Sequence, residues 1–489
     1  MSGSVHDQAH SETGGLDPQA SPESRSLGIH VLLVSILLLL NYGFRFAFAR
    51  SFPSSPLALI PNPDIMATMH RVLWHAPMSL LLPFEYEPHR YYWPPTLIVP
   101  MYLFHKTLSP FVVSVLTSSL LIVTGYLTCW SLFRSSVAGF IFGWMWVFGT
   151  QLTYSYTLGN LLALYIVLSY FLVNFIIAHR ILLDGARRRQ DGLLFLATLA
   201  VAALSSELWL NYGVFLLTAS GYFYCWSRHH NRPLTARGGS LVFMSTALVM
   251  VTYLVIRTRV AHQYMAPGAE EELIFAYSHP ALMIEDFIGN YFTLLYTALA
   301  NFLPSILFAS NAVVWYKPQT LIAEQHGYHE AFSYLVPVNY LLFWRYYAGV
   351  AAAAFGYLAG RSVRRSWRDP SRVHATMVML VAMIAVGFAT HLLIKFRPYN
   401  SVPALPYKAI VSILGVSLLT SYVVSLGGKR LGMVRYRLLV GSVMAAVLMA
   451  GFTRPRMLSA LLAQVGLQGF SDPLGDTLRF VRRALRHFL

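Results

Sequence analysis

Three properties of the sequence predict an all-α fold, a polytopic transmembrane helix bundle. Hydrophobic residues make up 56% of the 489 residues and charged residues only 11%, and the mean hydropathy is +0.54. A soluble protein needs far more charge to cover its surface. Apolar stretches recur at about the ~20-residue length that crosses a bilayer, roughly 11 of them. Short basic segments alternate with these stretches, as the positive-inside rule predicts for a membrane protein.

The N-terminal part of the chain predicts a polar tail followed by a first span. Residues 1–26 are small and polar with several Pro and Gly residues, which favours a disordered cytoplasmic tail. They lack the basic start and the cleavage site of a signal peptide. The apolar stretch 27–46 is therefore expected to be an uncleaved helix that starts on the cytoplasmic side.

The remaining apolar stretches complete a transmembrane domain over residues 27–460, with outer loops at 47–109 and 257–335. The stretch 289–308 is long enough to span, but one more crossing would invert every later loop, so we expect it to be re-entrant or to lie on the outer surface. Residues 461–489 are basic and amphipathic and predict a helix on the lipid surface. The further spans are expected near 110–131, 136–155, 159–178, 192–207, 208–226, 239–256, 336–359, 375–394, 406–426 and 436–452.

The formal charge of +16 is distributed in a way that argues against binding to nucleic acid. Nearly half of the 36 Lys and Arg residues lie in five short segments between spans. These segments are expected on the cytoplasmic side, where they orient the chain and attract anionic membrane lipids. The five segments are Arg134, 179–192, 228–239, 361–374 and 428–437.

The first outer loop contains the acid that most needs an explanation. Asp64 precedes apolar residues at helical spacing, which predicts a short amphipathic helix on the membrane surface with Asp64 at its N-cap. A cap alone would account for the residue. Alternatively, a carboxylate held there could act as a general base toward an acceptor hydroxyl. His70 and Arg71 on the next turn could support a phosphate leaving group or extend to lipid headgroups.

Further candidates lie at the expected outer ends of later spans. Glu207 ends the fifth span, where an acid either marks a functional site or faces headgroups. Lys395 and Arg397 come directly after a predicted span, on the outer face, and Tyr399 follows them in the sequence. Cations there run against the positive-inside trend, and Arg397 could grip a phosphate through two donors, although a pair reaching toward headgroups is the alternative. Arg345 is the one arginine identified well within a predicted span.

Metal and disulfide chemistry have little support in the sequence. The two cysteines, Cys129 and Cys225, both lie in apolar segments. Glu85 and Glu87 form an acid-x-acid pair, which is a weak signal for a divalent metal. We therefore expect no cofactor, with a divalent metal as the alternative.

Several stretches together resemble GT-C-type integral membrane glycosyltransferases, a class that includes the protein mannosyltransferases and aminoarabinose transferases. The resemblance covers about residues 27–230 and the stretch around Arg397. It rests on the spacing of segments in these regions, on the acid in NPDIMATMHR, on the Pro-Pro motif in YYWPPTLIVP and on FRPYNSVPALPYKA. It implies that Asp64 is the catalytic base or positions the acceptor, and that Arg397 holds the phosphate of a polyprenyl-phosphate-linked sugar.

The sequence therefore leads to one principal hypothesis and two alternatives. The principal hypothesis is an enzyme of the cell envelope that transfers a sugar from a polyprenyl-phosphate carrier to a glycan, lipid or protein acceptor. The expected location is a bacterial inner membrane, with the active face periplasmic. The alternatives are a lipid or solute transporter or flippase, for which an inverted repeat and mid-membrane charges would be expected, and a non-catalytic membrane scaffold.

Overall fold

The computed structural model describes the helical part of the chain. The described residues are 22–51, 84–87, 90–92, 110–149, 159–185, 189–206, 208–261, 338–369, 371–390 and 409–464, together with scattered positions between 284 and 303.

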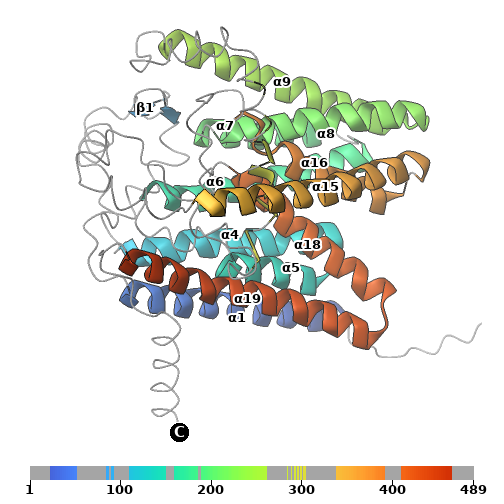
Figure 1. The fold of residues 1–489 in the computed structure, drawn as a ribbon. Helices are drawn as coiled ribbons and strands as arrows, with labels where there is room; N and C mark the ends of the chain where they lie inside the picture. The colour runs from blue at the N-terminus through green and yellow to red at the C-terminus, as the bar shows by residue number, and fades with distance from the viewer. Residues whose placement is uncertain are drawn as a thin grey trace, which may run out of the picture.

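A helix is found at each span that the hydropathy pattern predicts. Their bounds are α1 Pro22–Ser51, α4 Pro110–Phe133, α5 Ser136–Trp144, α6 Gly159–Asp184, α7 Arg189–Ser205, α8 Trp209–His229, α9 Pro233–Ala261, α15 Val338–Arg368, α16 Arg372–Val386, α18 Ile410–Arg430 and α19 Met433–Gln464. α5 continues as a π-helix, η2, over Met145–Gly149. The helices run side by side across the molecule (Figure 1).

Six of the described helices are long and apolar enough to cross a membrane, namely those containing Leu27–Phe46, Ser114–Phe133, Leu164–Asp184, Pro233–Val255, Ile410–Arg430 and Met433–Phe452. Three shorter apolar helical stretches accompany them, at Ser136–Gly149, Gln190–Ser205 and Arg372–Val386. These long apolar helices are compatible with the expected multi-pass membrane protein. Short strands are a departure from an all-α fold: β1 (Phe84–Glu87) pairs antiparallel with β2 (Arg90–Tyr92).

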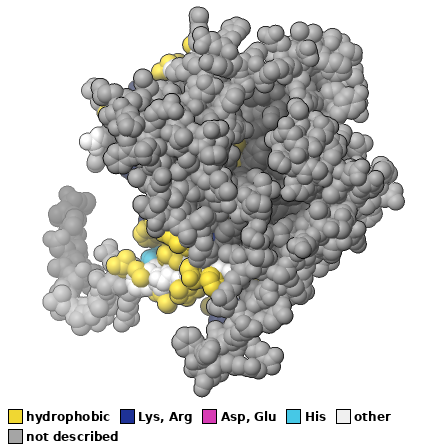
Figure 2. Space-filling model, turned by 90° about the vertical axis from the view of Figure 1, so that its left-hand side faces the viewer, with side chains coloured by type: hydrophobic (Ala, Val, Ile, Leu, Met, Phe, Trp, Pro, Cys, Tyr) yellow, Lys and Arg dark blue, Asp and Glu magenta, His cyan; other side chains and the backbone are white. Residues whose placement is uncertain are grey.

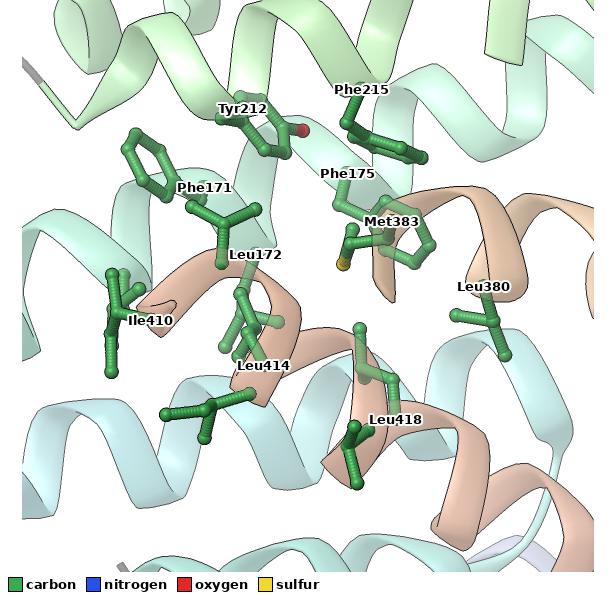
Figure 3. Close-up of a cluster of buried hydrophobic side chains, with 14 of the residues drawn as sticks. Phe171, Leu172, Phe175, Tyr212, Phe215, Leu380, Met383, Ile410, Leu414 and Leu418 are labelled. Carbon is green, nitrogen blue, oxygen red and sulfur yellow. The ribbon is translucent and has the colours of Figure 1, made fainter. Parts of the chain in front are cut away.

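α6 and α18 form the centre of the bundle. In the most apolar stretch of α6, 72% of the residues are buried, and in that of α18, 78% are buried. The corresponding shares are 11% in α19 and 17% in α1. Side chains from α6, α8, α16 and α18 pack together in one buried cluster (Figure 3). It includes Phe171, Tyr212, Met383 and Leu414. The outer helices α1, α9 and α19 expose large apolar side chains, as expected for surfaces in contact with lipid.

The basic turns meet at one end of the bundle. Arg372 at the start of α16 donates to Asp184 at the end of α6 over 2.9 Å. The Trp226 indole of α8 donates to the carbonyl of Ser366 in α15, and the Ser425 hydroxyl of α18 donates to the carbonyl of Phe133 in α4. The α8–α9, α15–α16 and α18–α19 turns all lie on the right-hand side of Figure 1. We call this side the basic end.

The lengths of α4 and α6 give the distance between the basic end and the opposite end of the bundle. The 20 residues Ser114–Phe133 of α4 and the 21 residues Leu164–Asp184 of α6 each rise about 30 Å at 1.5 Å per residue. This equals the thickness of the hydrocarbon core of a typical bilayer. The opposite end, called the distal end below, faces the viewer in Figure 2, where the described side chains that are visible are mainly hydrophobic.

Described residues of the stretch predicted to be re-entrant lie near the distal end. Positions 291, 292, 294–296, 298 and 299 are helical. Tyr291 packs edge-on against Phe388, which follows α16. Phe302 packs against Trp146 of η2.

Candidate functional site

All the site residues predicted from sequence fall outside the residues that the structure describes. They are Asp64, His70, Arg71, Glu207, Lys395, Arg397 and Tyr399. The predicted amphipathic helix after Asp64, Pro94-Pro95 and most of the C-terminal segment 461–489 lie outside them as well.

The described chain ends that lead into these segments nevertheless share one end of the bundle. α1 ends at Ser51, thirteen positions before Asp64, on the side of its residue Arg45, which contacts the second turns of α4 and α6. Ser206 immediately precedes Glu207 at the start of α8, where its hydroxyl accepts from the backbone N–H of Leu208. Thr390 precedes Lys395 by five positions. Ser51, Ser206 and Thr390 all lie at the distal end.

Asn211, shortly after Ser206 in the chain, forms a buried hydrogen-bonded pair with Thr390. The Oδ1 atom of Asn211, in the first turn of α8, accepts from both the backbone N–H and the hydroxyl of Thr390, at 3.0 and 2.6 Å. Asn211 is fully buried and Thr390 nearly so. This pair ties the residues that follow α16, from which the chain continues toward Lys395 and Arg397, to the start of α8.

The most unusual charged group among the described residues is Arg45. Its side chain is 1% exposed within the apolar first span. Its Nε donates to Asn41 Oδ1 at 2.9 Å, its Nη1 to Ser114 Oγ at 2.6 Å and its Nη2 to Tyr165 hydroxyl at 2.9 Å. The three acceptors come from α1, α4 and α6, so one guanidinium joins three helices.

The groups around Arg45 are themselves held in place. Asn41 lies one helical turn before it and donates through Nδ2 to the hydroxyls of Ser118 and Ser119. The guanidinium carbon lies 5.1 Å from the centre of the Tyr165 ring, within cation–π range. A charged group is costly at membrane depth unless it is solvated by the protein, and these neutral oxygens and the ring contribute to that solvation.

The π-helix η2 lies beside this cluster. The Trp146 ring meets the Tyr165 ring edge-on at 6.5 Å, and its indole N–H donates to Ser417 Oγ in α18 at 3.1 Å. Phe148 of η2 packs against Phe44, the neighbour of Arg45 in α1. π-helical turns inside α-helices occur frequently at functional sites. The distal end therefore combines an irregular helix with a buried cation.

Two roles fit the geometry of Arg45. It stabilises the junction of α1, α4 and α6 through three hydrogen bonds. It also places a permanent positive charge near the distal end, in a low-dielectric setting where attraction to a phosphate is only weakly screened. A planar guanidinium matches the oxygens of a phosphate or a carboxylate.

Arg45 was not predicted as a site residue, because it lies at the edge of the first span. Arg345 was predicted to be the arginine well within a span, but its side chain, in the first half of α15, is outside the described ones. The signal that could have found Arg45 is its spacing from Asn41. Two polar residues four positions apart share one face of an otherwise apolar helix.

Within the described residues, no group of three or more His, Cys, Asp or Glu side chains is arranged to hold a metal ion. The pair Glu85 and Glu87 lies in β1, where the register shifts between them. Comparison of the chain with family models and with curated proteins finds no match.

Proposed function

We propose that the chain is a membrane glycosyltransferase that moves a sugar from a polyprenyl-phosphate carrier to an acceptor hydroxyl. In this proposal it crosses a bacterial inner membrane about eleven times with its N-terminus in the cytoplasm. The basic end faces the cytoplasm, and the reaction takes place at the distal end, in the periplasm. The acceptor is a glycan, a lipid or a protein.

The observation that carries the proposal is the buried Arg45 at the same end of the bundle from which the chain continues toward Asp64, Glu207 and Arg397. A polyprenyl-phosphate donor presents an anion at the membrane surface, and a cation about one bilayer thickness from the basic end favours the anion there. The resemblance to GT-C-type enzymes supports the same location for the chemistry.

The proposed reaction assigns one role to each candidate residue. Asp64 accepts the proton of the acceptor hydroxyl as its oxygen attacks the anomeric carbon. The bond between that carbon and the carrier phosphate oxygen breaks, and the phosphate leaves with the electron pair. Arg397 and Lys395, with His70, stabilise the phosphate charge that develops.

The remaining candidates bind the reactants on either side of this bond. Arg71 supports the leaving phosphate, and Tyr399 packs against the sugar beside Arg397. Glu207 accepts hydrogen bonds from sugar hydroxyls. Arg45 contributes a fixed positive charge behind the phosphate. A divalent metal is not required by this scheme.

A transfer assay in membranes tests the proposal. Radiolabelled polyprenyl-phosphate sugars of several kinds are supplied as donors, and label in the acceptor is compared between the native chain and Asp64→Asn. We expect transfer by the native chain and loss of at least a hundredfold in the variant, with Asp191→Asn near the basic end as the matched control. Native-rate transfer by Asp64→Asn removes that residue from the mechanism.

The same assay separates the alternatives. A flippase would carry the labelled donor across the bilayer without cleaving the bond to the sugar, so label would stay on the lipid. A scaffold would neither transfer nor move the label. Either outcome, across the full panel of donors, contradicts the proposed reaction.

A further inference from the structure

Two of the basic turns adjoin each other at the basic end. The Trp226 indole of α8 donates to the carbonyl of Ser366 in α15 at 2.8 Å. The rings of His229 and Trp367 stack at 5.2 Å with an interplanar angle of 25°. The α8–α9 turn and the α15–α16 turn therefore form one continuous surface, which we call the double-turn surface.

The double-turn surface is strongly basic. Each of its two turns contributes exposed arginines. Two acids lie nearby: Asp184 binds Arg372 at 2.9 Å, and Asp369 lies 3.1 Å from the His374 ring. The arginines outnumber these two acids, so the surface keeps a net positive charge. The exposed arginines of this surface are Arg228, Arg232, Arg237, Arg361, Arg364, Arg365, Arg368 and Arg372.

Apolar side chains lie among these arginines. Leu234 is 53% exposed, Val363 39% and Trp367 36%. The surface therefore combines phosphate-binding donors, an interfacial tryptophan and exposed aliphatic side chains. This combination matches a phospholipid headgroup at the junction of its phosphate, glycerol and acyl chains.

We propose that the double-turn surface is a binding site for the phosphodiester headgroups of anionic phospholipids. Its place at the ends of apolar helices puts the arginines at the depth of the headgroup region. A nucleic acid would meet the same charges, but it offers no apolar partner for Leu234, Val363 and Trp367. The site is separate from the proposed sugar-transfer end by about the 30 Å length of the helices, and it does not depend on that reaction.

The α18–α19 turn supplies a matched control for this site. Arg430, Arg435 and Arg437 are exposed at the same end of the bundle. The Gly427 and Gly428 region there packs against Tyr436 of the same hairpin. Removing three charges from this turn changes the net charge of the protein as much as removing Arg364, Arg365 and Arg368 does.

The experiment titrates the purified full-length chain in neutral detergent with fluorescent phosphatidylglycerol and, separately, with fluorescent phosphatidylcholine. We expect tighter binding of phosphatidylglycerol by the native chain. The triple variant Arg364→Gln, Arg365→Gln, Arg368→Gln should weaken that binding about a hundredfold, because each arginine near a lipid phosphate contributes about fivefold. The control triple variant Arg430→Gln, Arg435→Gln, Arg437→Gln should weaken it less than twofold.

A second set of variants keeps the test decisive if the glutamine triple variant fails to fold. Replacing Arg364, Arg365 and Arg368 by Lys retains the charge and should retain most of the binding, and Trp367→Ala should weaken it while every arginine is present. Equal losses in the two glutamine triple variants, or equal native affinity for the two lipids, would overturn the proposal. Displacement of phosphatidylglycerol by a short duplex DNA at lower concentration than by unlabelled phosphatidylglycerol would do so as well.

Discussion

Arg45 donates a hydrogen bond to the Tyr165 hydroxyl at 2.9 Å while its guanidinium carbon lies 5.1 Å from the centre of the same ring. The two residues are 120 positions apart in the chain. Their contact joins α1 to α6 at the distal end, next to the π-helical turn η2. A single tyrosine thus provides both a hydrogen-bond acceptor and a π face to a buried cation.

Tyr165→Phe separates the two contributions of this tyrosine. The ring and its cation–π contact remain, but one N–H of a buried guanidinium loses its acceptor. We expect a loss of about 1–3 kcal/mol in the free energy of unfolding. Thermal unfolding of the purified protein in detergent measures it. The matched control is Tyr224→Phe, at an exposed position of α8, and an equal effect of the two changes would contradict the assigned role of the hydroxyl.

Two substitutions of Arg45, by Gln and by Lys, distinguish the effect of its charge from the effect of its hydrogen-bond geometry. A unit charge about 10 Å from the donor phosphate, at an effective dielectric constant of about 20, contributes roughly 1.7 kcal/mol, or about tenfold in binding. We expect Arg45→Gln to raise the KM for the donor about tenfold. Arg45→Lys should stay within about threefold, because it keeps the charge, while losing stability, because an ammonium lacks the planar fork.

The KM in this comparison is measured only with variants that elute as single species on size exclusion. An unchanged KM for folded Arg45→Gln would leave Arg45 with a purely structural role. It would also remove the main structural support for a phosphate at the distal end.

The pair formed by Asn211 and Thr390 predicts unequal effects of two substitutions. Thr390→Val removes one hydroxyl donor and should cost about 1 kcal/mol, while Asn211→Ala also leaves the backbone N–H of Thr390 without its acceptor and should cost about 2–4 kcal/mol. Thr218→Val, at an exposed hydroxyl that bonds only within α8, should change little. Denaturant unfolding followed by tryptophan fluorescence gives these values. A Thr390→Val effect as large as that of Asn211→Ala would contradict the assigned bonds.

Replacement by alanine is expected to affect the melting temperature differently at Gly238 and at Gly441. A Cβ at Gly238 in α9 would collide with the backbone carbonyl of Ile181 in α6, whereas a Cβ at Gly441 in α19 meets no atom within 4 Å. A backbone carbonyl has no side-chain freedom with which to move aside. We expect Gly238→Ala to lower the melting temperature by several degrees, and Gly441→Ala to leave it unchanged or to raise it, since alanine favours a helix by about 1 kcal/mol.

The positions of the helices could be predicted from hydropathy because each apolar stretch has to be helical at membrane depth. The predicted stretch 159–178 became α6, Gly159–Asp184, and 406–426 became α18, Ile410–Arg430. The convergence of the basic segments at one end was also predictable, because charge asymmetry sets the orientation of each span. The contacts Arg372–Asp184 and Ser425–Phe133 confirm that these segments share an end.

The buried cluster around Arg45 could not be predicted in this way. Ser114 and Tyr165 lie 69 and 120 positions from Arg45, so their contact depends on how three helices pack. The change from α-helix to π-helix after Trp144 leaves the hydropathy pattern unaltered. The pairing of β1 with β2 likewise has no counterpart in that pattern. The predicted site residues from Asp64 to Tyr399 stay predictions.

Sugar transfer by the purified chain is the most direct test of the proposed enzyme. The protein is reconstituted into vesicles with radiolabelled polyprenyl-phosphate sugars and a mixture of acceptors, and the label remaining on the lipid is followed with time. We expect the native chain to move label from one donor into an acceptor, Arg45→Gln to do so with a raised KM, and Asp64→Asn to transfer no label. Label that stays on every donor with the native chain, or that leaves equally fast with Asp64→Asn, would contradict the proposed reaction.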